Sequence, residues 1–470
     1  MLIRSRIGLN QIIFSVVFVF AGILGYQMVI HFDSKLALVL GGVLGILIII
    51  MRPVLGLAAY LVIYPMVPAE GSLNMLKAAM FGLTVVLLAI WLSKKLISNK
   101  PFHLEPEYRW LFIFFIFLFF SLLLGSSNNF TLVDWARDIA PLLNLLLIPI
   151  MVDFFENDRN RWLLYLIVVP VSLSMVRDIL VLLERYEFPL GSLSTILSSP
   201  LLSLSLPTLD PSIGLCLGLL MYLQNAPHKR LWLILSVMSL VIVFLTPTRT
   251  VWIATATISF LIIAFTSRKR LWAVASIAIL VTATGWLIFS TMGPSTYRES
   301  QADRLQELRD FRLDVSYQNR IEEIKQAGEL FLSSPIYGVG FGYQYNFWRP
   351  FVQSIGPGYL NTNSMHTDIM FFVSKGGVIG LFLFGMMLRG LGKKLYQLRK
   401  EKPDGLQSTW ASFGLVMIIS SLIIGSSTPF YQTRWATFAF AILLAVGLSR
   451  NAKGINGSHS VSAKISNRCF

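Results

Sequence analysis

The feature that most constrains the fold is a series of apolar runs that recurs along almost the whole chain. Hydrophobic residues make up 55% of the 470 residues, charged residues make up 13%, and the mean hydropathy is +0.67. Runs of about 15 to 20 residues are long enough to span or nearly span a bilayer as helices. A backbone in hydrocarbon must satisfy its own hydrogen bonds, and the sequence lacks the short alternating segments of a β-barrel. The sequence therefore predicts an all-α, polytopic membrane protein.

We expect about 12 to 14 transmembrane helices, because several of the runs are short for a bilayer. The first run follows a basic N-terminus but has no clear cleavage site, so we interpret it as a retained helix and not as a signal peptide. The expected spans are Gln11–Ile30, Leu36–Ile50, Val54–Val67, Leu76–Ile97, Trp110–Leu124, Leu132–Val152, Trp162–Leu183, Pro211–Leu223, Leu231–Leu245, Val251–Thr266, Trp272–Met292, Ile369–Leu388, Trp410–Ile424 and Trp435–Leu448.

Basic residues gather in alternate short connections, which predicts the orientation of the chain. Lys94, Lys95 and the segment Lys393–Lys402 lie on the basic side, whereas 125–131 and 425–433 contain no Lys or Arg. By the positive-inside rule, both termini are expected to be cytoplasmic. The net charge of +15 is then explained by membrane topology, and we predict no nucleic-acid partner.

This orientation divides the chain into four parts. Residues 1–291 form the N-terminal transmembrane helices, and residues 292–366 form one large external loop. Residues 367–450 form the C-terminal transmembrane helices. The Ser-, Asn- and Gly-rich residues 451–470 are expected to be a disordered cytoplasmic tail.

Helical spacing of apolar residues predicts that the external loop is partly helical. We expect a surface helix over Gln301–Leu313 and a second helix from about Arg320 to Leu332. Asn319 and Glu322 form an expected capping pair at the start of the second helix. The run Gly356–Gly358 predicts a turn.

Three polar residues on the expected outer face are candidates for function. Arg249 lies in a short connection between two apolar runs, Arg320 at the expected N-terminus of a loop helix, and His366 where an apolar run begins. Two guanidinium groups near a helix N-terminus suit a diphosphate, because their planar forks match phosphate oxygens. The alternative is that the arginines are interfacial anchors and that the histidine is structural.

Other charged residues occur where charge is costly. Arg177 and Asp178 lie within an apolar run, where they either form a structural ion pair or line a cavity that is open to the outside. Asp134, Arg137 and Asp138 begin another run and are interpreted as an interfacial cluster with a possible substrate contact.

The sequence predicts no cofactor and no metal site. The run Gly338–Gly342 resembles a nucleotide loop only superficially, since no strand is predicted before it. His366 and Asp368 are too few for a metal site, and Cys216 and Cys469 exclude a site built on cysteines.

Several motifs together resemble the O-antigen ligase and polysaccharide polymerase superfamily of bacterial inner-membrane glycosyltransferases. They are Thr248–Thr250, the arginine-led helix that ends in Ser334–Gly342, and His366 with the downstream Gly376–Leu381. Two positions depart from the family pattern, since Thr367 replaces a common asparagine and Lys375 replaces an acidic residue. The family's functional residues match, by position, Arg249, Arg320 and His366.

The resemblance implies that a glycan is transferred from an undecaprenyl (polyprenyl) diphosphate carrier to an acceptor sugar or to lipid A-core. The reaction would take place at the outer face of the bacterial cytoplasmic membrane, without nucleotide or metal. Arginines would stabilise the leaving diphosphate, and His366 would act as general base or hold the diphosphate. Gly338, Gly340 and Arg434 are further candidate contacts to the substrate.

Two other functions remain open at this point. The chain could be a repeat-unit polymerase of the same superfamily, whose acceptor is itself linked to a lipid diphosphate. It could also be a transporter or flippase for lipid-linked glycans. The concentration of polar features in the external loop, and the lack of an internal repeat, favour an enzyme.

Overall fold

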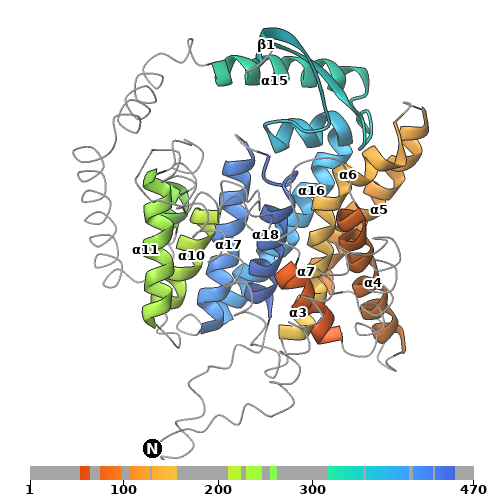
Figure 1. Ribbon diagram of the computed structural model, residues 1–470. Coiled ribbons are helices and arrows are strands. Elements are labelled where there is room, and N and C mark those ends of the chain that lie inside the picture. Colours follow the sequence, from red (N-terminus) through yellow and green to blue (C-terminus); the bar gives the residue numbers. More distant parts are fainter. Residues whose placement is uncertain are drawn as a thin grey trace, which may run out of the picture.

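The protein is a bundle of helices with a small polar layer across one end, as the computed structural model shows (Figure 1). The structure describes residues 53–63, 75–97, 105–127, 130–155, 210–223, 229–245, 255–261, 315–352, 356–401, 406–426 and 429–449. The expected spans Gln11–Ile30, Leu36–Ile50, Trp162–Leu183 and Trp272–Met292, the loop helix Gln301–Leu313 and the tail 451–470 lie outside these residues.

The described elements are mostly helical, and residues 255–261 form a further short helical stretch. In chain order the elements are α3 (Pro53–Ile63), α4 (Met75–Ile97), α5 (Pro106–Ser127), α6 (Leu132–Leu143), η2 (Asn144–Leu146), α7 (Leu147–Phe155), α10 (Asp210–Leu223), α11 (Lys229–Leu245), α15 (Val315–Ser333), β1 (Tyr345–Val352), β2 (Gly356–Thr362), α16 (Asp368–Glu401), α17 (Leu406–Gly425) and α18 (Arg434–Leu448).

Within the described residues, three helical segments are long and apolar enough to cross a membrane. They are Pro106–Leu124, Leu132–Phe155 and Asp368–Glu401, and shorter apolar helices cover Arg230–Val243, Trp410–Gly425 and Ala436–Leu448. The predicted class, an all-α polytopic membrane protein, is confirmed. The two-stranded sheet β1–β2 is a small addition that the sequence did not predict.

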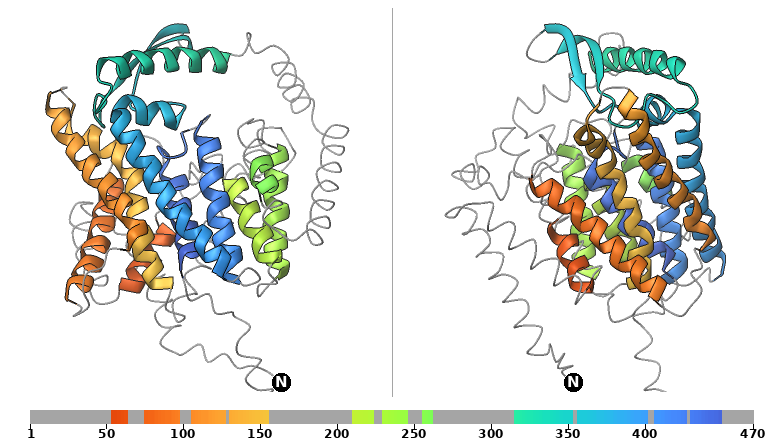
Figure 2. Two further views of the ribbon diagram at one scale, coloured as in Figure 1. Left: turned by 180° about the vertical axis from the view of Figure 1, so that it is seen from behind. Right: turned by 90° about the vertical axis from the view of Figure 1, so that its right-hand side faces the viewer.

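The polar layer consists of α15, the β1–β2 hairpin and the segments that join them to α16; we call residues 315–352 and 356–366 the cap. Figure 2 shows in both views that the cap lies across one end of the bundle. α15 packs against α16 and β1, while α16 packs against α5 and α17. The cap is therefore held by the same helix that continues into the bundle.

The hairpin has an antiparallel register that pairs Tyr345 with Thr362 and Val352 with Gly356. Tyr345 and Phe347, on one face of β1, are buried, and their rings stack with centroids 5.0 Å apart. The run Gly356–Gly358, predicted to be a turn, instead begins strand β2. The glycine and proline signal was correct about a nearby reversal but wrong about its position.

Helix α15 begins earlier than the sequence predicted. It starts at Val315, so Arg320 lies in the second turn and not at the N-terminus. The expected capping pair is also wrong, because Asn319 lies inside the helix and Glu322 accepts a hydrogen bond from Lys325 Nζ at 2.6 Å. The positive end of the helix dipole favours an anion only within the first turn, so it does not add to anion binding at Arg320.

Helix α16 is broken at Gly377, whose φ of 61° and ψ of −162° are not helical. A break leaves backbone groups without helical partners, which is costly in a membrane helix. The segment after α15 supplies the missing partners. Its Val339 and Gly340 amides donate to the carbonyls of Ser374 and Lys375 at 2.9 and 3.0 Å.

The same segment also accepts hydrogen bonds from beyond the break. The amides of Val378 and Ile379 donate to the carbonyls of Pro335 and Ile336 at 2.9 and 3.2 Å. The segment after α15 and the break in α16 approach each other so closely that a Cβ on Gly377 would lie 2.4 Å from the Ile336 oxygen. The glycine-rich motif thus fixes the end of α15 to the break in α16.

Candidate functional site

A histidine and a buried carboxylate meet where the cap joins α16. Glu323 of α15 is 3% exposed, and its two carboxylate oxygens lie 2.7 and 2.8 Å from Nδ1 of His366. One of these oxygens also accepts a hydrogen bond from the His366 backbone amide at 3.1 Å. A single carboxylate therefore holds both the ring and the main chain of His366.

Arg320 lies three residues before Glu323 on α15, so the two side chains share one face of the helix. Its Nε is buried and has no hydrogen-bond partner among the described residues. A guanidinium group presents a planar fork of donors that fits phosphate oxygens. Arg320 is thus a half-buried cation on the helix face that contacts His366.

The backbone around His366 is fixed from a second direction, by the loop between α17 and α18. The Gln432 side chain accepts from the Met365 amide at 2.8 Å and donates to the Met365 carbonyl at 3.0 Å. Asp368, at the start of α16, accepts from the Phe430 and Tyr431 amides at 2.9 Å each. These contacts hold His366 between α15 and the α17–α18 loop.

A buried ion pair anchors the other side of the cap. Lys375 is fully buried, and its ammonium donates to Asp138 of α6 and, at 2.8 Å, to the Asn363 carbonyl. Asp138 also accepts from the Gly342 amide at 2.6 Å. The ammonium lies 4.7 Å from the ring centroid of Tyr345. The pair therefore links α6, α16 and the cap at one point.

Tyr345 closes this network, and its hydroxyl lies 3.0 Å from the hydroxyl of Ser374. Burial raises the pKa of Tyr345 well above its ordinary value. Tyr345 is thus neutral over the physiological range. It contributes a polar contact and an aromatic face to the network, but no charge.

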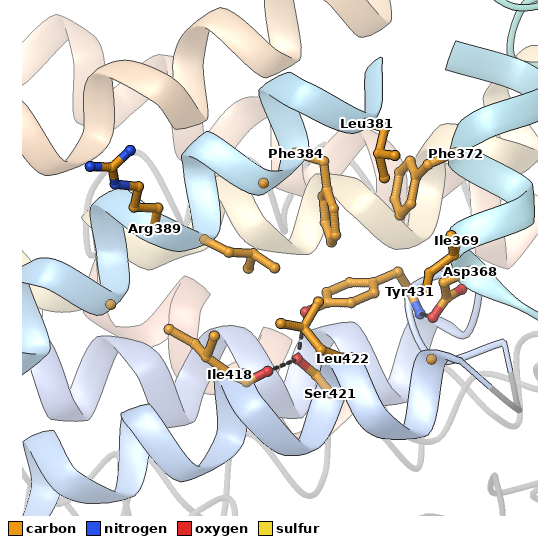
Figure 3. Close-up of a pocket in the computed structure, with 14 residues that line it drawn as sticks. Asp368, Ile369, Phe372, Leu381, Phe384, Arg389, Ile418, Ser421, Leu422 and Tyr431 are labelled. Carbon is orange, nitrogen blue, oxygen red and sulfur yellow. Dashed lines mark hydrogen bonds between the residues drawn. The ribbon is translucent and has the colours of Figure 1, made fainter. Parts of the chain in front are cut away.

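An apolar cavity of about 650 Å³ lies between α16 and α17 (Figure 3). Asp368 and Tyr431 lie near one end and Arg389 lies toward the other. Most of its lining is hydrocarbon, from side chains such as Phe372, Phe384, Leu388, Ile418 and Leu422. Its Asp368 end is two residues from His366 in the chain, so an apolar space adjoins the polar site.

The structure brings together only part of the predicted site. Arg249, Arg177 and Asp178 lie outside the described residues, and Arg434 begins α18 with a side chain that is not described. Gly338 and Gly340 are buried in the contact with α16, where a Cβ on Gly338 would lie 2.4 Å from the Lys375 backbone. Their contact with substrate stays a prediction.

Sequence reasoning missed Glu323 and the partner of Lys375. Glu323 belongs to a run of charged residues on an amphipathic helix, and nothing in that run distinguishes a buried carboxylate from an exposed one. The unexpected Lys375 was a signal, because a cation in an apolar run requires an anion nearby. Asp138 was noted as part of a charged cluster and proves to be that anion.

Among the residues that the structure describes, no three His, Cys, Asp or Glu side chains are grouped so that they could hold a metal ion. The carboxylate and imidazole of Glu323 and His366 supply two such groups, and they are joined directly to each other. The arrangement can therefore orient a histidine for proton transfer or for contact with an anion.

Fold and site together define an integral membrane protein with a polar site between a cap and the end of its helical bundle. Residues 234–385 match the family model described as O-antigen ligase, which confirms the resemblance to the O-antigen ligase superfamily. The matched segment contains Arg249, Arg320 and His366, and also Glu323 and Lys375. No curated protein matches the chain.

Proposed function

We propose that the protein transfers a glycan from a polyprenyl diphosphate carrier to an acceptor sugar at the outer face of the cytoplasmic membrane. The observation that carries this proposal is the pairing of His366 with Glu323 beside Arg320, inside a segment that matches the O-antigen ligase family. An oriented histidine and a cation that can bind an anion are what the reaction requires.

The acceptor hydroxyl oxygen forms a bond to the anomeric carbon of the glycan, and the bond from that carbon to the diphosphate oxygen breaks. The electron pair of the broken bond stays on the diphosphate, where negative charge grows. Arg320, and Arg249 as the family resemblance implies, would stabilise this charge without a metal ion. The proton of the hydroxyl passes to His366 in its role as general base. In the alternative, His366 contacts the diphosphate and the proton passes to an oxygen of the departing diphosphate.

The apolar cavity between α16 and α17 suits the hydrocarbon part of such a donor. It begins beside Asp368, two residues after His366, and follows α16, which is long and apolar enough to cross a membrane, and α17, a shorter apolar helix. A carrier whose diphosphate reaches Arg320 would place its isoprenoid chain on this side of the bundle. The cavity thus supports a lipid-linked donor over a soluble one.

The orientation follows from the basic residues on the helices. Lys94 and Lys95 end α4, and Arg399 and Lys400 end α16, at the ends of these helices that lie away from the cap. The positive-inside rule places these ends in the cytoplasm, and the cap then faces outward. Lipid-linked glycans would therefore meet the enzyme on the outer side.

Deletion of the gene in its native cell tests this function. We expect the long glycan to disappear from its acceptor while carrier-linked glycan accumulates. Long carrier-linked polymers would indicate a ligase, and carriers that hold a single repeat would indicate a polymerase. An unchanged glycan profile, or carrier-linked glycan trapped on the cytoplasmic side as expected for loss of a flippase, would refute the proposal.

A further inference from the structure

We infer that Glu323 is a positioning residue that fixes the tautomer of His366, so that Nδ1 carries the proton and Nε2 accepts one from the acceptor hydroxyl. The inference rests on the proposed function, since it gives His366 the role of base in that reaction. It assigns to the buried carboxylate of α15 a task that packing alone would not require.

The first step concerns hydrogen-bond roles. An ionised carboxylate can only accept hydrogen bonds, so Nδ1 at 2.7 and 2.8 Å from its oxygens must be the protonated nitrogen of the ring. The other nitrogen of a neutral imidazole, Nε2, then carries a free electron pair. The His366 side chain is 40% exposed whereas that of Glu323 is 4% exposed, so the ring is held from the buried side and remains accessible from the open side.

The second step concerns charge. When Nε2 takes the proton of the acceptor hydroxyl, the ring becomes an imidazolium beside the Glu323 carboxylate. The carboxylate stabilises this cation and does not itself take the proton, as in hydrolases that pair a carboxylate with a histidine. The Nδ1 proton stays in place throughout, and only the proton from the acceptor moves.

The third step concerns the main chain, and it predicts what glutamine would do at this position. One carboxylate oxygen accepts from the His366 backbone amide at 3.1 Å. In Glu323→Gln the only side-chain oxygen must stay there to avoid an unpaired amide, so the NH2 group turns toward Nδ1. Nδ1 then has to accept, and the ring proton moves to Nε2. The shape of the site is kept while the base is removed.

The test compares three variants of the full-length protein in nanodiscs. Glu323→Gln reverses the tautomer, and Glu323→Asp keeps a carboxylate. Glu322→Gln is the matched control, because it removes one negative charge from the adjacent residue, whose partner is Lys325 and not His366. The rate of glycan transfer is measured at saturating donor, together with the ring ¹⁵N signals of His366, assigned by comparison with His366→Gln.

Glu323→Gln should lower kcat by roughly a hundred- to ten-thousand-fold, because a base in the wrong tautomer cannot take the proton. Its ¹⁵N signals should show the proton on Nε2. Glu323→Asp should keep the proton on Nδ1 and recover most of the rate, and Glu322→Gln should match the wild type. A purely structural role would lower the amount of folded protein without moving the ring proton.

A Glu323→Gln variant that keeps wild-type kcat would overturn the inference, as would ring signals that still place the proton on Nδ1. Inactive wild-type protein that is folded and loaded with donor would instead refute the proposed function. The two failures are therefore distinct.

Discussion

Breaking the buried ion pair between Lys375 and Asp138 by a single substitution should strongly destabilise the protein, because it leaves the other charge without its partner in a buried site. Lys375→Met keeps the length of the side chain but leaves the Asp138 carboxylate with only the Gly342 amide as a described partner. Asp138→Asn leaves the ammonium with the Asn363 carbonyl and two aromatic faces. Each single change therefore strands one charge in a buried site.

The burial of both side chains sets the magnitude. Lys375 is 0% and Asp138 4% exposed at the side chain, so water cannot solvate the remaining charge. Breaking a pair of this kind costs about 3 to 5 kcal/mol. Replacing both charges leaves no stranded ion. The double variant should therefore lose less free energy of unfolding than the two single variants lose together, by at least ~2 kcal/mol.

The assay is the free energy of unfolding in mixed micelles, followed by tryptophan fluorescence over a denaturant titration. The exposed pair Lys325–Glu322, with side chains 61% and 29% exposed, provides a matched cycle. Its coupling should be about 0 to 1 kcal/mol. The reasoning fails if the losses in free energy of unfolding from Lys375→Met and Asp138→Asn simply add in the double variant. It also fails if each loss is no larger than that of the corresponding single variant in the exposed pair.

Three further predictions concern the site and its orientation. Arg320→Ala should slow glycan transfer by roughly a hundred- to thousand-fold without loss of folded protein, and Arg320→Lys should recover little because it lacks the fork, as single-turnover rates can check. Gly385 lines the cavity and has open space beside its Cα, so Gly385→Leu should fill part of the cavity and raise the KM for the lipid-linked donor several-fold. Gly82→Leu on α4 is the control, because that position is equally unobstructed but lies outside the cavity, and it should leave this KM unchanged. In a cysteine-free background, Tyr359→Cys should react with a membrane-impermeant thiol reagent in intact cells, because Tyr359 is exposed on the cap. Ile97→Cys, exposed at the opposite end of the bundle, should react only after lysis, and the reverse pattern would show that the predicted orientation is wrong.

The sequence predicted the bundle well because long apolar runs have few alternatives in a membrane. The expected span Leu76–Ile97 corresponds to α4, and Leu231–Leu245 corresponds to α11, each within two residues. The run Leu132–Val152 becomes α6, η2 and α7. Thr131 caps its start in the structure, and Pro141 lies shortly before the 3-10 turn that interrupts it.

The cap was harder to predict, because its elements depend on contacts between distant residues. Strand β1 pairs with β2 and packs on α15, and neither contact leaves a periodic pattern that a short sequence window reveals. The local sequence around Gly377 does not predict the break either, because the same residues could continue a straight helix. It becomes favourable only because the segment after α15 supplies hydrogen bonds to the broken ends.

Only part of the candidate site could be predicted, because its residues also come together through contacts between distant parts of the chain. His366 and Arg320 were proposed as candidates from their positions beside apolar runs and from the family resemblance, and their functional roles stay predictions. Glu323 is 43 residues from His366 in the chain, and only the fold of the cap brings its carboxylate to the imidazole. Charge pairs across a fold are visible in sequence only when one member, like Lys375, lies in an apolar run.

The most direct test of the central claim is glycan transfer by the purified protein in nanodiscs, given carrier-diphosphate glycan and acceptor without nucleotide and with a chelator present. We predict that wild-type protein forms the glycosylated acceptor and releases the carrier diphosphate, and that His366→Ala and Arg320→Ala, equally folded, form almost none. Transfer by both variants at the wild-type rate, or a strict requirement for a divalent ion, would contradict the account.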